Sequence, residues 1–309
     1  MDKNIYMEIA RLIGQPINEQ LPVPVEISAI ADTFTAEPGE KVWYYGSQDT
    51  DADEILDVDS NGDITVVKVN PMTDTQLTFK DYNSKLQYVL VSDVLSKPDT
   101  QVLGRKKARI SHGLDKTELR AILTAINNAT SVQSVTPVSG QDLYDIIIAA
   151  KHKLEDYGDN FLLLAGSQVS EKIDTYDKDN ITSHNYNLNL KAKLKEAGIT
   201  PMKIFGKVKN TGDTTEQPLL NTKRFILIAR NSRIAEGKPI IFVRRKISAD
   251  IAQLMGADVD KAQRALFVNP TPVIVSGTNK LAYGVYGYES VVQAIVNPKA
   301  ICKVTADVV

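Results

Sequence analysis

Apolar residues near the start of the chain repeat with a helical spacing. Four of them share one face of a short helix predicted over residues 2–14: Ile5, Ile9, Leu12 and Ile13. A helix of about 12–15 residues or fewer is marginal in water, so this one needs a partner surface, either its own core or a neighbouring subunit. Pro22 and Pro24 then favour extended geometry in the residues before them. The first thirty residues are therefore predicted to form an arm, a small helix on an extended tether.

Strand-like patterns replace the helical one from residue 37 to about residue 97. The β-favouring runs are 41–45, 54–58, 63–69, 76–80 and 86–91. Asn61-Gly62, between the second and third of these runs, is a strong hairpin signal. Because this stretch has many strands but few large apolar residues, it predicts a projecting β-hairpin rather than a domain with its own core.

Helical spacing returns at residues 105–128, which are predicted to form one helix or a broken pair of helices. Within this range, Asp115 with Glu118 is predicted as an N-terminal cap. The clearest helix comes next, between a cap at Ser139 or Gly140 and a stop at Gly158. Its apolar stripe consists of Leu143, Ile146, Ile147, Ala150 and Leu154. The unbroken apolar run 161–165 then predicts a buried strand.

Short elements alternate through the second half of the chain. Two helices are predicted at 168–176 and 188–197, the second ended by Gly198. The predicted strands are 202–208, 224–229, 239–243, 265–268, 273–275, 281–285 and one or two within 291–304. No internal repeat is visible.

Composition is that of an ordinary globular protein. Apolar residues make up 43% of the chain and charged residues 24%. A length of 309 residues is at or beyond the size at which one core stops growing, so two subdomains are expected. The one cysteine, Cys302, excludes an internal disulfide framework. The chain has no secretory signal at its start and no long uncharged apolar run, so we expect it to be soluble, made in the cytoplasm and free of membrane contact.

Charge is distributed unevenly along the chain. The first hundred residues carry 18 Asp and Glu against 7 Lys and Arg, and the remaining 209 carry 20 against 29. Complementary potentials fix register and disfavour wrong partners, so this asymmetry suggests that the two parts meet opposite surfaces on neighbouring subunits. The alternative is that the acidic block is a solvated loop.

One loop resembles a calcium site. Residues 57–65 match the first nine positions of an EF-hand loop, with candidate ligands at Asp57, Asp59, Asn61 and Asp63. The twelfth position, which should be a bidentate Glu, is Lys68, and the flanking segments are strand-like. A hairpin turn is therefore the preferred interpretation. The histidines lack metal-ligand spacing, and no nucleotide-binding or hydrolase motif occurs, so neither a cofactor nor an enzymatic activity is expected.

Basic residues gather in two clusters, Arg105–Arg109 and Arg244–Lys246. The first contains Arg105, Lys106, Lys107 and Arg109. Each cluster is suited to neutralising phosphates without sequence preference. A solvated face, or a partner for the acidic hairpin, is an equally good interpretation.

The order of elements resembles that of the major capsid proteins of tailed bacteriophages, with the Hong Kong 97-type fold. The most similar stretches are 88–95 leading into the 105–129 helix, 141–158 followed by 161–165, and 281–289. This resemblance implies an α+β fold with an N-arm at 1–35 and an E-loop hairpin at 37–97. It implies a spine helix and P domain at 105–185, an A domain at 188–285, and C-terminal strands at 286–309 that return to the P domain.

The resemblance also implies a function. Such a subunit would assemble into hexamers and pentamers of an icosahedral head around double-stranded DNA, as part of a virion built in the host cytoplasm. A portal would be a partner, and so would a separate scaffolding protein, because little room precedes the arm if Met1 is the true start. Some relatives cross-link a Lys to an Asn of another subunit, but no motif selects among Lys68, Lys80 and Lys85.

Two sets of residues are assigned roles on this interpretation. The predicted subunit interface comprises Ile5, Ile9, Leu12, Ile13, Trp43, Tyr44, Tyr45, Asp51, Asp53 and Glu54. The predicted DNA-facing strip is Arg105, Lys106, Lys107 and Arg109, with pairing to a neighbouring acidic hairpin as its alternative. Other functions left open are an encapsulin-like compartment, a calcium-dependent surface protein and, with least support, a hydrolytic enzyme.

Overall fold

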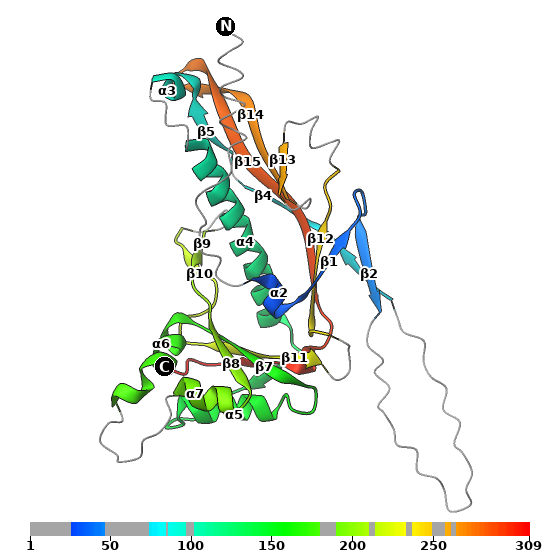
Figure 1. Cartoon of the computed structure of the whole chain (residues 1–309), viewed down its shortest axis with the longest axis vertical. Helices are drawn as coiled ribbons and strands as arrows, with labels where there is room; N and C mark the ends of the chain where they lie inside the picture. The colour runs from blue at the N-terminus through cyan, green and yellow to red at the C-terminus, as the bar shows by residue number, and fades with distance from the viewer. Residues whose placement is uncertain are drawn as a thin grey trace, which may run out of the picture.

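The computed structural model describes most of the chain in nine segments. These are residues 26–46, 74–84, 86–96, 102–179, 190–209, 214–232, 237–248, 257–260 and 264–309. One long helix, α4 (Val102–Asn128), lies alongside a large β-sheet, and its C-terminal end meets a second β-sheet of different build (Figure 1). The α+β prediction is confirmed, and 105–128 forms one helix rather than a pair.

A seven-stranded sheet lies along the first half of α4 and is built around one long strand, β15 (Thr278–Ile295). The other members are β1 (Asp32–Ala36), β4 (Lys80–Asn83), β5 (Gln87–Leu90), β12 (Ile240–Arg245), β13 (Ala257–Asp260) and β14 (Arg264–Val275). Strand β1 is parallel to β12, and the remaining pairs are antiparallel. Ile110 and Leu114 of α4 pack on Leu266, Tyr283 and Val285 of this sheet.

A five-stranded sheet meets the other end of α4. Its order is β6 (Gln133–Val135), β16 (Ile301–Val304), β11 (Phe225–Ser232), β7 (Gly158–Ala165) and β8 (Ile199–Lys203). Three helices cover one face: α5 (Leu143–His152), α6 (Ser167–Asp179) and α7 (Leu190–Glu196) (Figure 1). On the other face, Leu162 and Leu164 join a core with Ile122 and Ile126 of α4. Both faces are thus buried, which explains the continuous apolar run in β7.

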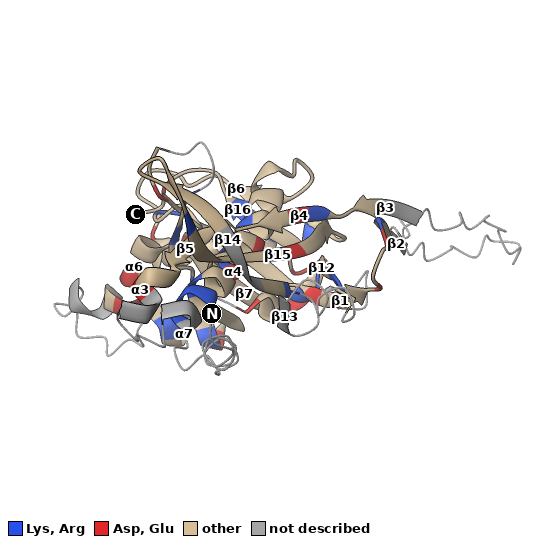
Figure 2. Cartoon of the chain, turned by 90° about the horizontal axis from the view of Figure 1, so that it is seen from above, with Lys and Arg blue, Asp and Glu red and all other residues tan. Residues whose placement is uncertain are grey.

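The remaining elements are short. They are α2 (Ile27–Ile30), β2 (Val42–Gly46), β3 (Asp74–Thr78), α3 (Val91–Ser96), β9 (Lys207–Val208), β10 (Gln217–Pro218) and the 3₁₀-helix η1 (Pro298–Ala300). Strands β2 and β3 form an antiparallel ribbon, called the hairpin below, that projects from the body (Figure 2). A projecting hairpin was predicted for this part of the chain.

The strands divide the chain differently from the predicted ranges. A boundary between 105–185 and 188–285 separates β7 from β8 and β11, although these strands are hydrogen-bonded neighbours in one sheet. The predicted 188–285 unit is split, because β11 belongs to the five-stranded sheet and β12 to the seven-stranded one. The range 286–309 is split as well, between the end of β15 and β16.

The predicted arm and the predicted coreless hairpin also need correction. The last residues of 1–35 are part of the body, because Ile27 and Ile30 of α2 are buried in the main core and β1 pairs with β12. Residues 1–25 lie outside the described part. The hairpin has an apolar root, since Trp43 and Leu77 pack against a small cluster on β1, β12 and β15.

Candidate interaction surfaces and the ionic core

A buried ionic cluster joins α4 to the seven-stranded sheet. Arg244 on β12 donates two hydrogen bonds to Glu118, from Nε to Oε1 at 2.8 Å and from Nη2 to Oε2 at 2.7 Å. Arg264 on β14 donates from Nε to Glu289 Oε2 at 2.8 Å and from Nη1 to Asp115 Oδ1 at 3.0 Å. The Glu118 and Glu289 side chains are each only 1% exposed. Asp115 and Glu118 are therefore anchors of the helix to the sheet, and the predicted N-terminal cap is wrong.

The cluster contains three carboxylates but only two guanidinium groups. Burial and, after it, the negative charge of Glu118 raise the pKa of Glu289 to about 7, against the lowering effect of Arg264. Glu289 Oε1 has no hydrogen-bond partner among the described residues. A proton on Glu289 would balance the charge of the cluster, so this carboxyl is the group that should titrate near neutral pH.

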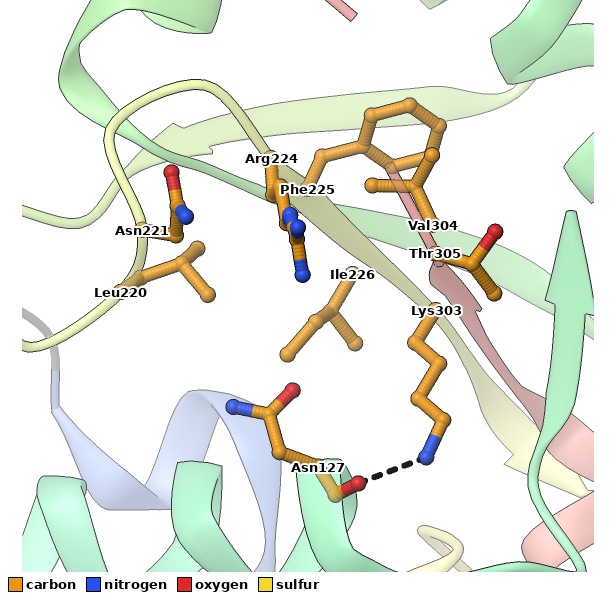
Figure 3. Close-up of a pocket in the computed structure, with 9 residues that line it drawn as sticks. All are labelled: Asn127, Leu220, Asn221, Arg224, Phe225, Ile226, Lys303, Val304 and Thr305. Atoms are coloured by element: carbon orange, nitrogen blue, oxygen red, sulfur yellow. Dashed lines mark hydrogen bonds between the residues drawn. The ribbon is translucent and has the colours of Figure 1, made fainter. Parts of the chain in front are cut away.

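The far end of α4 is capped by a lysine from β16. Lys303 Nζ donates to the carbonyl oxygen of Asn127 at 2.7 Å (Figure 3). It also donates to the carbonyl oxygen of Ala129 at 2.9 Å, and its charge has the sign that the helix dipole favours at this end. A pocket of about 440 Å³ lies beside this cap. It is lined by Asn127, Leu220, Asn221, Arg224, Phe225, Ile226, Lys303, Val304 and Thr305. Both of its cations already hold partners, because Arg224 Nε donates to Asp307 at 3.2 Å.

The basic clusters do not form continuous surfaces. On the first turns of α4, Arg105 and Arg109 are exposed and Lys106 is half-buried, but Lys107 is only 4% exposed. Lys107 therefore does not belong to an outward strip. The second cluster is divided by the alternation of β12, which sends Arg244 towards α4 and Arg245 towards the hairpin root.

Few of the predicted interface residues can be placed. Trp43 is half-buried and stacks on Phe34, with ring centroids 6.3 Å apart. Tyr44 and Tyr45 lie on β2, in register with Gln76 and Thr75 of β3. The other predicted interface residues lie outside the described part: Ile5, Ile9, Leu12, Ile13, Asp51, Asp53 and Glu54.

The described residues contain neither a metal-binding cluster nor a membrane-spanning helix. The possible calcium ligands Asp57, Asp59, Asn61 and Asp63 also lie outside the described residues. Within the described segments, no group of three or more His, Cys, Asp or Glu is arranged to hold a metal ion. His152 is exposed, with Nδ1 at 2.8 Å from Glu155 Oε2. None of the helices in the described part is long and apolar enough to cross a membrane.

Comparison with known proteins gives likeness in structure alone. No protein-family model matches the chain, and no curated protein matches it in sequence. A chain from Microbacterium phage Oxtober96 superposes with a TM-score of 0.59 at 12% identity, covering 99% of this chain and 100% of that one. The capsid of a native gene transfer agent particle gives 0.59 at 10% identity, covering 94% and 93%. A virus-like particle from Pyrococcus furiosus gives 0.51 at 12% identity, covering 97% and 99%. The likeness therefore includes both sheets and the helix between them.

Proposed function

We propose that this chain, which has the Hong Kong 97-type capsid fold, is the major subunit of an icosahedral phage head that encloses double-stranded DNA. The observation that carries the proposal is the extent of the likeness, which spans 94% and 93% of the two chains in the gene transfer agent capsid. A partial match would have suggested a shared domain in a different architecture. A match over nearly all of both chains supports the same kind of shell.

The parts of the fold suit this role. The seven-stranded sheet with α4 would form the peripheral domain and the spine, and the five-stranded sheet with its three helices would form the axial domain of hexamers and pentamers. This proposal reverses part of the predicted assignment, because α5, β7 and α6 lie in the range predicted as the P domain, whereas β12, β14 and the first part of β15 lie in the range predicted as the A domain. The β2–β3 hairpin would be the base of the E-loop, and the residues before α2 the N-arm. A portal and a scaffolding protein are the further partners that this function implies, with assembly in the host cytoplasm and a place in the virion.

Electron microscopy of the purified protein tests the proposal directly. Shells, capsomers or tubes are expected as protein concentration rises, whereas a species that stays strictly monomeric at high concentration would contradict a shell function. Particles purified from producing cells should contain genome-length DNA that nuclease reaches only after disruption.

An encapsulin-like compartment is the second candidate. The observation that favours it is the likeness, over 97% of this chain, to a Pyrococcus furiosus particle described as virus-like rather than as a phage. The contents of the particles decide between the two functions. Protein or RNA inside, and a cargo-loading peptide encoded in the same operon, would replace the phage-head proposal with this one.

Contact with packaged DNA belongs to the same proposal. Arg105 and Arg109 are exposed one helical turn apart, with Lys106 between them, so they present positive charge on one side of α4. Such a strip would lower the energy of confined DNA by releasing counterions, without reading bases. Its alternative role is to pair with the acidic part of a neighbouring E-loop.

Charge reversal separates these two roles. If the strip faces DNA, the double variant Arg105→Glu, Arg109→Glu should form normal empty shells but fewer stable DNA-filled particles. Loss of shell assembly itself would favour the pairing role. Lys172→Glu with Lys203→Glu is a control of equal charge change, because both of these lysines are exposed in the five-stranded lobe.

A further inference from the structure

We propose that Arg245 fixes the direction in which the β2–β3 hairpin leaves the body, so that each subunit enters assembly with its hairpin already aimed. The consequence for the shell rests on the proposed function. The geometry within one subunit does not, and it can be tested on its own.

Arg245 ties both roots of the hairpin to the central strand of the sheet. Its Nη1 donates to the carbonyl oxygen of Glu40, just before β2, at 2.9 Å. Its Nη2 donates to Asp81 Oδ1 at 3.2 Å, just beyond the return strand, and to Tyr288 Oη of β15 at 3.1 Å. Tyr288 closes the arrangement by donating to Asp81 Oδ1 at 2.9 Å. One side chain thus connects the segment before β2, the segment after β3 and the central strand β15.

An apolar pad lies beneath these polar contacts. The Phe79 ring centroid is 5.4 Å from the Arg245 guanidinium carbon, a cation–π arrangement. Phe79, Trp43 and Leu77 pack on the small cluster that contains Val243 of β12. The alternation of β12 accounts for this layout, since Phe242 and Arg244 face the α4 side while Val243 and Arg245 face the hairpin root. Polar contacts and apolar packing from the same face of β12 therefore act together on the root.

The contacts require an arginine. A guanidinium carries five N–H donors in a rigid planar fork, and Arg245 uses that fork to reach acceptors on three separate segments. The Arg245 side chain is only 19% exposed, so it is packed as well as charged. The next residue, Lys246, makes a single exposed ion pair with Glu37 at 2.6 Å. A lysine at 245 would keep the charge but lose the fork.

Hydrogen exchange on unassembled subunits tests the geometry. A two-stranded ribbon is marginal without support, so Arg245→Lys and Arg245→Gln should speed amide exchange in Val42–Gly46 and Asp74–Thr78 about tenfold. Exchange in Phe225–Ser232, in the other sheet, should not change. Lys246→Met is the matched control and should leave the hairpin at its original rate. The shells of both Arg245 variants, seen by electron microscopy, should vary in diameter or open into tubes.

Several results would overturn the proposal. Unchanged exchange in β2 and β3 in both Arg245 variants would show that the root is held without this side chain. Faster exchange with shells of uniform, unaltered size would show that aiming the hairpin does not matter to assembly. If an Arg245 variant loses protection in both sheets, its fold as a whole is disturbed, and Tyr288→Phe replaces it as the test because it removes only one bridging hydroxyl. Tyr288→Phe must then show faster exchange that is confined to the hairpin. If the unmodified protein forms no shells, the proposed function fails while the exchange test keeps its meaning.

Discussion

Replacing Glu289 with glutamine should change how the stability of the subunit depends on pH. Glu289 is 1% exposed, accepts a hydrogen bond from Arg264 Nε at 2.8 Å, and belongs to a cluster with one more carboxylate than guanidinium groups. A glutamine has nearly the same shape. Its amide oxygen can keep the bond from Arg264, and its NH₂ group takes the place of Oε1. The substitution therefore imitates the protonated acid at every pH.

The sign and the size follow from proton linkage. Burial and the charge of Glu118 raise the pKa of Glu289 from 4.5 to about 7, so the folded state binds the proton more tightly than the unfolded state. The resulting stability is fully present below pH 4.5 and is lost as pH rises through 7. At 1.36 kcal/mol for each pKa unit, the loss is on the order of 3 kcal/mol. The glutamine variant should lack this loss.

Urea unfolding of unassembled subunits between pH 4.5 and 8 measures the effect. The unfolding free energy of Glu289→Gln minus that of the unmodified protein should rise by about 3 kcal/mol across this range. Burial lowers the pKa of His112, which acts with the opposite sign in the same window, but this contribution cancels in the difference. Glu171→Gln, the same substitution at an exposed position on α6, is the matched control. A flat difference for Glu289→Gln would refute the assignment of the proton to the ionic cluster.

Other substitutions test how the helix and the lobes are held. Lys303→Met removes the ammonium group that caps α4 and should lower the unfolding free energy by about 1–2 kcal/mol, measured by urea titration. Gly287→Ala would place a Cβ 2.7 Å from Ile110 Cγ2 between sheet and helix, and should lower the melting temperature through a loss of about 1–3 kcal/mol. Gly113→Ala meets nothing within 4 Å inside α4, so it should instead stabilise by up to about 1 kcal/mol. Burial raises the pKa of Cys302 to about 11, so a thiol reagent should label this residue only after unfolding, and rapid labelling of native protein would contradict its burial.

The sequence pattern identified elements with a one-sided apolar stripe, an unbroken apolar run or a clear end signal. The α5 stripe, the buried β7 and the glycine that ends α7 are examples, and Gly198 indeed adopts a positive φ of 76°. The long β14–β15 hairpin was predicted only as short separate strands. Pro270 and Pro272 lie within β14, yet they are tolerated because β13 pairs only with residues 264–267. Among the described residues no strand pairs with the outer edge of β14 at the prolines, and an edge of this kind is where a sheet tolerates proline.

The ionic cluster was beyond what the sequence could reveal. Ser111, Asp115 and Glu118 have the spacing of one helix face, but the same spacing also fits a capping signal near a helix start. Their arginine partners lie more than a hundred residues further along the chain, on strands whose register is set by the sheet. Local patterns carry no information about that meeting. The structure shows that one helix continues through Gly113, so Asp115 and Glu118 lie in the middle of this helix and not at its start.

The uneven charge along the sequence is used partly inside the subunit. Three carboxylates from the first hundred residues pair with cations from the region around β12: Asp32 with Lys238, Glu37 with Lys246, and Asp81 with Arg245. These pairs connect the strands that lead into and out of the hairpin to the sheet that supports it. Such partly exposed pairs contribute little to stability individually. The Asp81–Arg245 pair is the one that orients the hairpin, because it lies at the root of the segment of the described fold that projects from the body. Attraction between opposite charges would then act twice in the proposed shell, first by aiming the hairpin within a subunit and then by guiding it to a neighbour.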